Sequence, residues 1–222
     1  IDSLFPNKNY YYQVSSIQSA TGGQVSSNKL AATTLDTTSH NFSYQTFEFG
    51  EPLTGNSSRL YDVAIINEND IWAVGEIYMN DSLGNPDSKR YNAIIWDGTK
   101  WSVIRIPYYF QGQPFYNPIQ SVFTFGPSDV WFCGNGVVHF DGSSFIPVPI
   151  PTNVWGPYQM NKIWGSSSND LYVVGNSGNI AHYNGASWSK IESGTTSIIN
   201  DAWGITNEKN KTILYCAVSS FF

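Results

Sequence analysis

Short apolar runs alternate with tight turns along residues 162–191, and this pattern predicts four short β-strands. We expect the first strand to begin at Ile163, the second to cover 171–174, the third to cover 180–183 and the fourth to begin at Trp188. The connections contain Asn-Asp, Gly and Asn-Gly, which supply the backbone angles that tight hairpins require. This stretch is therefore a standard against which the rest of the chain can be aligned.

The same pattern recurs along most of the chain. Its second strand is repeated at 70–75, 129–134 and 170–175, and its last turn at 96–101, 140–145 and 183–188. The glycines of this turn, Gly98, Gly142 and Gly185, are 44 and 43 residues apart. A further copy begins at Ile199 and repeats the Ile-Trp-Gly sequence as Ala-Trp-Gly at 202–204. A period just above 40 residues, built from four strands, is typical of a β-propeller.

The predicted fold class is therefore all-β, with a partial β-propeller of about three and a half four-stranded blades. We expect blades at about 59–107, 118–150 and 159–194, and an incomplete blade at 198–222. An open arc of blades leaves an exposed edge. Because Ile1 does not begin an export signal, we expect an internal segment whose partner is the rest of its own polypeptide chain.

Residues 1–35 do not follow the repeat. Leu4 and Pro6 precede an alternating Tyr-Tyr-Tyr-Gln-Val strand at 10–14, and a polar strand covers 25–35. Together they resemble the tyrosine corner and last two strands of a fibronectin type III sandwich. The resemblance implies the C-terminal part of such a module before the propeller. A hairpin that belongs to the next domain is the alternative.

Residues 36–58 are expected to form a connector and an outer strand. The connector at 36–40 is short and polar, and residues 41–50 are rich in aromatic side chains, like the fourth strand at 101–107. Because this strand would precede every first strand, we expect it to be donated to a blade from the other end of the chain.

From about Leu60 onward, the repeat resembles bacterial exported β-propellers. The Ile-Trp-Gly strand, the Asn-Asp turn and the Tyr-Asn-Gly-x-x-Trp turn carry this resemblance. It implies an extracellular or cell-surface location. The spacing differs from the Asp-box of sialidase-like propellers, and the Gly-His and Trp-Asp pairs of WD repeats are absent.

Composition fits a globular all-β protein and excludes two classes of partner. Hydrophobic residues make up 41% and aromatic residues 16%, whereas charged residues make up only 13%. The net charge is −6 and the basic residues are scattered, so we expect no nucleic acid partner and no binding to anionic membranes. No apolar run reaches the length of about 18 residues that a spanning helix needs, so no membrane insertion is expected.

The titratable residues favour structural roles over catalysis. Asp70, Asp129 and Asp170 recur before the second strands, where an Asp side chain can cap its own turn. His139 and His182 share one place in the third strand, where another repeat has Ile, which favours packed, hydrogen-bonded histidines over metal ligands.

Catalytic and cofactor motifs are missing from the sequence. There is no phosphate loop, nucleophile elbow, Cys-x-x-Cys pair or His-Glu-x-x-His motif, so no catalytic residue, cofactor or metal is predicted. A calcium loop at 80–87 is the alternative to a solvated hairpin tip. Cys133 and Cys216 fall two repeats apart, and we expect buried thiols and no disulfide.

The candidate binding residues lie in connections that are longer than the repeat requires. The segments 76–92, 107–118 and 149–159 should all emerge on one face of the propeller. Their candidate ligand-binding residues are Tyr78, Tyr108, Tyr109, Phe115, Tyr116, Trp155 and Tyr158. Aromatic rings stack on sugars or anchor protein partners, although rings flanked by prolines can also seal gaps between blades.

Two functional hypotheses follow. The first is a non-enzymatic binding or scaffolding segment of a large exported cell-surface protein, which recognises a glycan or an extracellular protein through the aromatic loop face. The alternative is the propeller part of a carbohydrate-active enzyme whose catalytic residues lie outside residues 1–222. Converging carboxylates or a Tyr-Glu pair at the centre of the ring would distinguish the enzyme from the binding protein.

Overall fold

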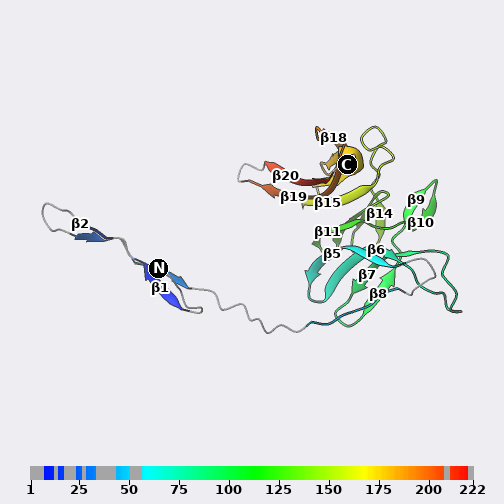
Figure 1. Cartoon of the computed structure of the whole chain (residues 1–222), viewed down its shortest axis with the longest axis horizontal. Coiled ribbons are helices and arrows are strands. Elements are labelled where there is room, and N and C mark those ends of the chain that lie inside the picture. The colour runs from blue at the N-terminus through cyan, green and yellow to red at the C-terminus, as the bar shows by residue number, and fades with distance from the viewer. Residues whose placement is uncertain are drawn as a thin grey trace. The chain divides into compact units, whose positions relative to one another are not determined.

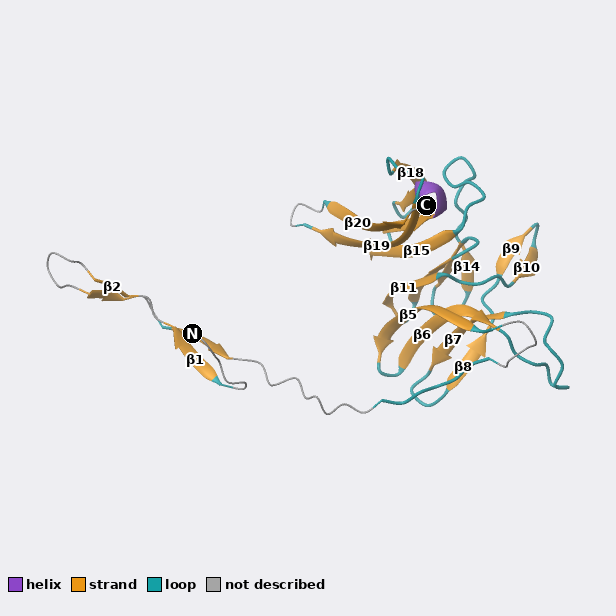
Figure 2. Ribbon diagram, in the orientation of Figure 1, coloured by secondary structure: helices purple, strands orange, loops and turns teal. Residues whose placement is uncertain are grey.

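A computed structural model describes residues 8–12, 15–17, 24–26, 29–33, 44–50, 57–207 and 211–219. Contacts within the chain divide it into two units, Ile1–Phe47 and Glu48–Phe222. The described residues are almost entirely strands and connections, with one short 3-10 turn, η1 (Asn176–Gly178), as Figure 2 shows.

The first unit contains two short antiparallel strand pairs. Strand β1 (Asn9–Tyr12) pairs with β4 (Leu30–Thr33), and β2 (Ser15–Ile17) pairs with β3 (Gln24–Ser26). The predicted tyrosine-corner residues Leu4 and Pro6 lie outside the described residues. The fibronectin-like module therefore stays a prediction, as does the alternative hairpin.

The described part of the second unit contains three four-stranded antiparallel sheets and two two-stranded sheets (Figure 1). Blade I contains β5 (Arg59–Asn67), β6 (Asp70–Ile77), β7 (Tyr91–Trp96) and β8 (Trp101–Ile104). Blade II contains β11 (Ser121–Gly126), β12 (Asp129–Cys133), β13 (Val137–Phe140) and β14 (Phe145–Pro147). Blade III contains β15 (Met160–Ser167), β16 (Asp170–Gly175), β17 (Asn179–Tyr183) and β18 (Trp188–Glu192). The half-blade contains β19 (Ile198–Thr206) and β20 (Thr212–Ser219), and an extra hairpin of β9 (Tyr108–Phe110) and β10 (Gln113–Phe115) joins blades I and II. The predicted all-β, propeller-like fold class is confirmed.

The tight turns form as their sequences predict. Gly98, Gly142 and Gly185 adopt positive φ angles of 86°, 92° and 87°, which favour glycine. The side chain directly before each glycine accepts hydrogen bonds from the turn backbone. Asp97, for example, accepts the backbone N–H of Thr99 at 2.9 Å. Hydrogen bonds from the Thr99 hydroxyl and from the turn backbone lower the pKa of Asp97 to about 2.

The first strands of the blades lie side by side and share one register. Strand β11 contacts β5 and β15, and β15 contacts β19. Equivalent cross-strand pairs are Ala64 with Trp72, Phe123 with Trp131, Trp164 with Tyr172, and Trp203 with Tyr215. Positions in different blades can therefore be compared directly.

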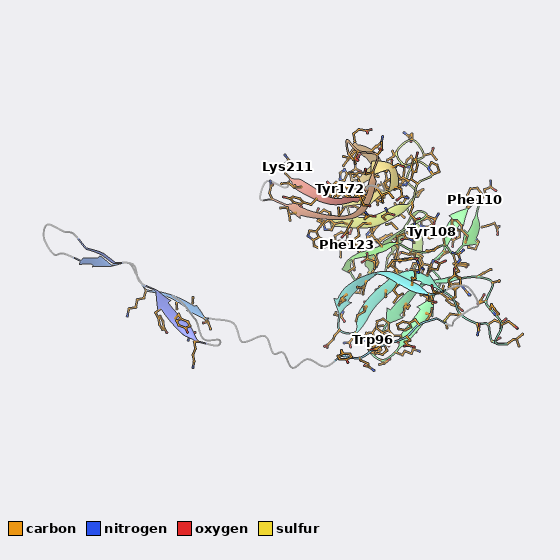
Figure 3. All side chains as sticks on the ribbon, viewed as in Figure 1. Trp96, Tyr108, Phe110, Phe123, Tyr172 and Lys211 are labelled. Atoms are coloured by element: carbon orange, nitrogen blue, oxygen red, sulfur yellow. The ribbon has the colours of Figure 1, made fainter. Side chains whose placement is uncertain are left out.

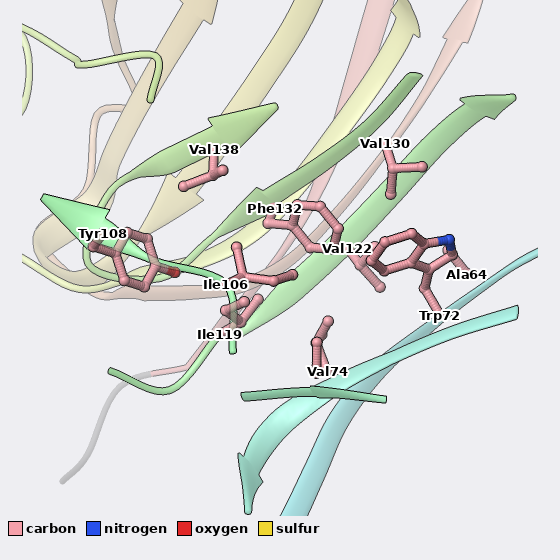
Figure 4. Packing of buried hydrophobic residues seen from close by; sticks show 11 residues of the cluster. Ala64, Trp72, Val74, Ile106, Tyr108, Ile119, Val122, Val130, Phe132 and Val138 are labelled. Carbon is pink, nitrogen blue, oxygen red and sulfur yellow. The ribbon is translucent and has the colours of Figure 1, made fainter. Parts of the chain in front are cut away.

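Hydrophobic clusters fill the spaces between successive blades. Trp72 of blade I packs on Phe132, Phe140 and Phe145 of blade II, with ring centroids 5.3 to 6.3 Å apart. Figure 4 shows this cluster, in which side chains from both blades meet. A second cluster joins Trp131 of blade II to blade III, and a third joins blade III to the half-blade.

In the described part of the expected outer strand, residues 44–50, the ring of Phe49 packs edge-on against Trp101, with ring centroids 5.5 Å apart. A donated closing strand therefore stays a prediction. The expectation that Asp70 caps its own turn was wrong: its carboxylate accepts a hydrogen bond from the indole Nε1 of Trp72, on the same strand, at 3.1 Å, while Asn67 accepts the backbone N–H of Asn69 in the turn at 2.8 Å. The Asp70 carboxylate is available to Trp72 because a nearer side chain already caps the turn.

Candidate functional site

Aromatic side chains from two connections surround one hollow, which we name the aromatic cleft. Its volume is about 770 Å³, and its walls are the β9–β10 hairpin, the edge of blade II at β13 and β14, and the connection 149–159. The ring-bearing residues that line it are Tyr108, Tyr109, Phe110, Phe115, Trp155 and Tyr158. None of the lining residues carries a charge. Figure 3 labels Tyr108 and Phe110 at this place on the molecule.

The β9–β10 hairpin positions one wall of the cleft. Its two-residue turn is Gln111-Gly112, with φ angles of 49° and 76°, as a tight hairpin turn requires. Tyr108 pairs with Phe115 across the hairpin, and their rings stack with centroids 5.6 Å apart. Beyond this pair the hairpin leaves the core, so that Tyr109 is 50% exposed and Phe110 is also exposed.

Tyr108 anchors the hairpin to blade II. Its ring is buried in the same cluster as Ile106 and Ile119, as Figure 4 shows. The backbone of Gly134 comes so close that a Cβ atom there would lie 2.8 Å from the Tyr108 hydroxyl oxygen. Burial raises the pKa of Tyr108 far above its ordinary value, so this phenol stays neutral. Its role is therefore to fix the hairpin.

The connection 149–159 forms the opposite wall. The backbone N–H of Trp155 donates to the carbonyl of Pro151 at 2.9 Å, and its indole Nε1 donates to the carbonyl of Tyr158 at 2.8 Å. Trp155 is buried against Met160, whereas Tyr158 is 47% exposed. The connection thus buries one ring as an anchor and presents the other to solvent.

Tyr78 and Tyr116 lie away from the aromatic cleft. The Tyr78 hydroxyl donates to Glu76 at 2.6 Å, and the carboxylate of Glu76 also pairs with Arg90. Tyr116 lies 5.9 Å from the guanidinium of Arg105. That guanidinium stacks on Tyr91 at 3.8 Å and forms an ion pair with Asp87.

The structure therefore divides the seven candidate residues into three groups. Tyr109, Phe115 and Tyr158 line the cleft with some exposed surface, while Tyr108 and Trp155 line it from buried positions. The rings of Tyr108 and Trp155 pack between elements of the fold and offer little free surface. Tyr78 lies with Glu76 and Arg90, and Tyr116 lies near Arg105. These arginine contacts form because the long connection 76–92 folds back over the end of β8.

A charged cluster from the first strands was not predicted. The carboxylate of Asp62 accepts hydrogen bonds from Ser121 Oγ at 2.6 Å and Lys162 Nζ at 3.0 Å, and Lys162 lies 3.9 Å from Asp201. These four residues pair with Val74, Cys133, Val174 and Ala217 and so occupy equivalent positions. An alignment of the first strands of the blades would have placed these four polar residues at one position and so could have revealed the cluster.

The carboxylates in this charged cluster are held by cations and donors. Asp62 also accepts the backbone N–H groups of Val122 at 3.1 Å and Val63 at 3.0 Å, so that four donors satisfy it. The cluster joins the first strands of the three blades and the half-blade, and its geometry supports a structural role.

The recurring Asp and His side chains form pairs within blades. His139 Nε2 lies 2.8 Å from Asp129, and His182 Nε2 lies 2.7 Å from Asp170. The His139 ring also stacks on Trp131, at 4.3 Å. These histidines are packed and hydrogen-bonded, as expected.

The next blade adds a hydroxyl to each of these pairs. Ser168 of blade III donates to Asp129 of blade II, and Thr212 of the half-blade donates to Asp170 at 3.1 Å. Burial works to raise the pKa of Asp170, but hydrogen bonds from Ser166, His182 and Thr212 outweigh it and hold the pKa below its usual value. Each carboxylate therefore links its own blade to the next.

The cysteines and the long hairpin carry no metal site in the described part of the chain. Cys133 and Cys216 are free thiols, and burial raises the pKa of Cys133 above its ordinary value. No group of three or more His, Cys, Asp or Glu side chains among the described residues could hold a metal ion. In the loop 80–87, Asp81 accepts the backbone N–H groups of Leu83 and Asn85, both at 2.9 Å. Among the same described residues, no helix is long and apolar enough to span a membrane.

The sheets and their repeated register place the second unit in the class of β-propeller-like, all-β structures. No protein-family profile and no curated protein sequence matches the chain. A solved structure titled "YCF48 bound to D1 peptide" is similar to it, with 16% sequence identity and a TM-score of 0.45. The match covers 67% of this chain and 45% of that one, so the chain spans less than half the length of that protein.

Proposed function

We propose that this chain is a non-enzymatic binding or scaffolding segment of a large exported cell-surface protein. It recognises its ligand, a glycan or an extracellular protein, through the aromatic cleft. The observation that carries the proposal is the arrangement of exposed rings around an uncharged hollow of about 770 Å³. Tyr109 and Tyr158 approach this hollow from opposite walls, each about half exposed.

Ring placement in the cleft supports recognition of an uncharged ligand. Buried Tyr108 and Trp155 hold the two walls rigid, so that little conformational entropy is lost when a ligand enters. Neutral polar groups such as Asn135 and Gln159 also line the hollow and can exchange hydrogen bonds with hydroxyl or peptide groups. A neutral sugar or an apolar, proline-containing peptide segment has this chemistry, whereas a polyanion does not.

The test is a double substitution, Tyr109→Ala with Tyr158→Ala. Because both rings are half exposed, we expect the free energy of unfolding to change by less than about 1 kcal/mol. Screening of the unaltered protein against arrays of neutral glycans and of peptides should give a ligand. The double variant should bind that ligand at least tenfold more weakly in calorimetry.

Tyr215→Ala is the matched control, because it removes an exposed tyrosine outside the cleft and should leave affinity unchanged. If the double variant bound as tightly as the unaltered protein, the aromatic cleft would not be the site. A loss of several kcal/mol in stability would show instead that Tyr109 and Tyr158 are packing residues.

A further inference from the structure

A fully buried amide side chain holds both ends of the connection that carries the β9–β10 hairpin. It belongs to Asn92, the second residue of β7. Its Nδ2 donates to the carbonyl of Ile106 at 2.9 Å and to the carbonyl of Asn117 at 3.0 Å, while its Oδ1 accepts the backbone N–H of Ile106 at 2.8 Å. Residues 107–116 leave the blade and return to it between these two points. One side chain therefore fixes the base of the hairpin.

The Asn92 amide serves these two backbone segments rather than the packing of blade I. An Asn amide has two donors and an oxygen with two lone pairs, and three of these four capacities are used here. Burying an amide is unfavourable unless its groups are bonded, and an apolar side chain could fill the same place without this requirement. What the amide adds is a bond to the chain on each side of the hairpin.

Equivalent positions in the other blades lack this arrangement. Asn92, Gly136 and Asn179 occupy the same place in the third strand, directly before the run that pairs continuously with the second strand. Gly136 has no side chain, and the Asn179 amide donates to the carbonyl of Asn176 in its own turn at 2.8 Å. The described connections that follow β14 and β18 contain no strand pair. The bridging amide thus occurs in the blade whose following connection carries a hairpin.

The base of the hairpin decides where one wall of the aromatic cleft stands. Strand β9 begins two residues after Ile106, and β10 ends two residues before Asn117. Tyr108 anchors the hairpin by its ring, whereas Asn92 anchors the backbone on both sides of it. Tyr109 lies farther along the hairpin and is half exposed. Any movement of the base is therefore carried to this ring, which faces the cleft.

We propose that Asn92 is a positioning residue for the ligand of the aromatic cleft. It does not line the hollow, and it acts by holding the β9–β10 hairpin at a fixed distance from the opposite wall. A wall that is held in place loses less conformational entropy when a ligand enters. The inference rests on the proposed function, because Asn92 has this role only if the cleft binds a ligand.

The experiment compares Asn92→Ala with Asn179→Ala, each in the full chain. The control removes a buried Asn side chain from the equivalent strand position of blade III, where its amide bonds the turn of its own blade. Amide hydrogen exchange followed by mass spectrometry should be about tenfold faster or more over 107–116 in Asn92→Ala, because local opening of the hairpin becomes easier. Exchange there should be unchanged in Asn179→Ala, and β12 and β16 should stay protected in both variants.

Binding is measured with Nile red, a neutral dye that fluoresces in apolar surroundings and suits an uncharged hollow. The part of its binding that disappears in the Tyr109→Ala, Tyr158→Ala double variant belongs to the cleft. Asn92→Ala should weaken this part by about threefold or more, because the wall is no longer held in place. Asn179→Ala should leave it unchanged, so that a general loss of stability is separated from a loss of positioning.

The outcomes separate this inference from the proposed function. Unchanged exchange over 107–116 in Asn92→Ala would overturn the inference. Dye binding that depends on Tyr109 and Tyr158 but not on Asn92 would also overturn it, while the cleft would remain the binding site. Dye binding that the double variant leaves intact would count against the proposed function, and the inference would fall with it.

A second variant covers the case in which Asn92→Ala unfolds the blades. Asn92→Ser keeps one hydrogen-bonding group at this place and is measured in the same way. If β12 and β16 lost their protection in this variant too, Asn92 would support the blades themselves, and the positioning role would be overturned.

Discussion

Trp131 of blade II and Tyr215 of the half-blade occupy the same place in the repeat, yet their surroundings differ. Both lie on the second strand and pair with an aromatic residue of the first. Trp131 is 4% exposed because Val173, Leu171 and Ala181 of blade III cover its ring, whereas Tyr215 is 61% exposed. An aromatic residue at this position contributes to the core only when a following blade is present.

Two residues at the same position of the repeat can therefore contribute unequally to stability. A single blade cannot bury its own faces, so most of its apolar surface is removed from water by its neighbours. Substitutions at equivalent positions should therefore have unequal effects, and three predictions test this.

The largest effect is expected for Trp131→Ala. Removing the indole leaves a cavity between blades II and III and should lower the free energy of unfolding by about 3–5 kcal/mol, measured by chemical denaturation. Tyr215→Ala at the equivalent open position should cost less than about 1 kcal/mol. Equal costs at the two positions would show that the open face is covered in solution.

An intermediate effect is expected for Gly204→Ala. The added methyl group would meet the Trp164 ring at 2.3 Å, so the half-blade must move away or the ring must change rotamer. Such overpacking should cost about 1–3 kcal/mol in thermal or chemical unfolding.

Gly126→Ala is the control for this prediction, because no atom lies within 4 Å of the added group. It should leave stability nearly unchanged. A neutral Gly204→Ala would mean that the half-blade is not held against blade III as the structure shows.

The smallest effect concerns the carboxylates that link blades. The pKa of Asp170 is lowered in the folded protein, so its contribution to stability is present above its unfolded value of 3.8 and is lost as the pH falls through the folded value. Asp170→Asn should therefore cost about 1 kcal/mol at pH 7, and this difference should shrink toward pH 3 in denaturation experiments.

Asp70 of blade I gives the opposite sign. Its carboxylate accepts a hydrogen bond from Trp72 Nε1. Ile95 pairs with Trp72, at the position where blades II and III carry the histidines that bind their Asp. Burial outweighs the Trp72 hydrogen bond and raises its pKa above 3.8. Stability should then rise as the pH falls through this raised value, and Asp70→Asn should remove that gain. Parallel pH profiles for the two variants would contradict the assignment.

The sequence predicted much of the propeller-like unit because its signals are local. The Asp-Gly and Asn-Gly turns, the apolar second strands and the period of just above 40 residues all depend on neighbours along the chain. The all-β class with its four-stranded antiparallel sheets and the packed His139 and His182 could be inferred in this way. The aromatic strand expected at 41–50 stays a prediction, because strand formation there depends on a partner strand.

What only the tertiary structure decided is how equivalent residues meet across blades. The pattern could not show that Tyr116 lies near Arg105, that Tyr109 and Tyr158 face one hollow, or that Asp62 binds Lys162. These contacts join residues separated by 11, 49 and 100 positions, and the geometry of the two longer-range ones depends on the angle between whole sheets. The sequence by itself therefore determined the blades, while the packing of one blade on the next determined which side chains became core, which became surface and which form the candidate site.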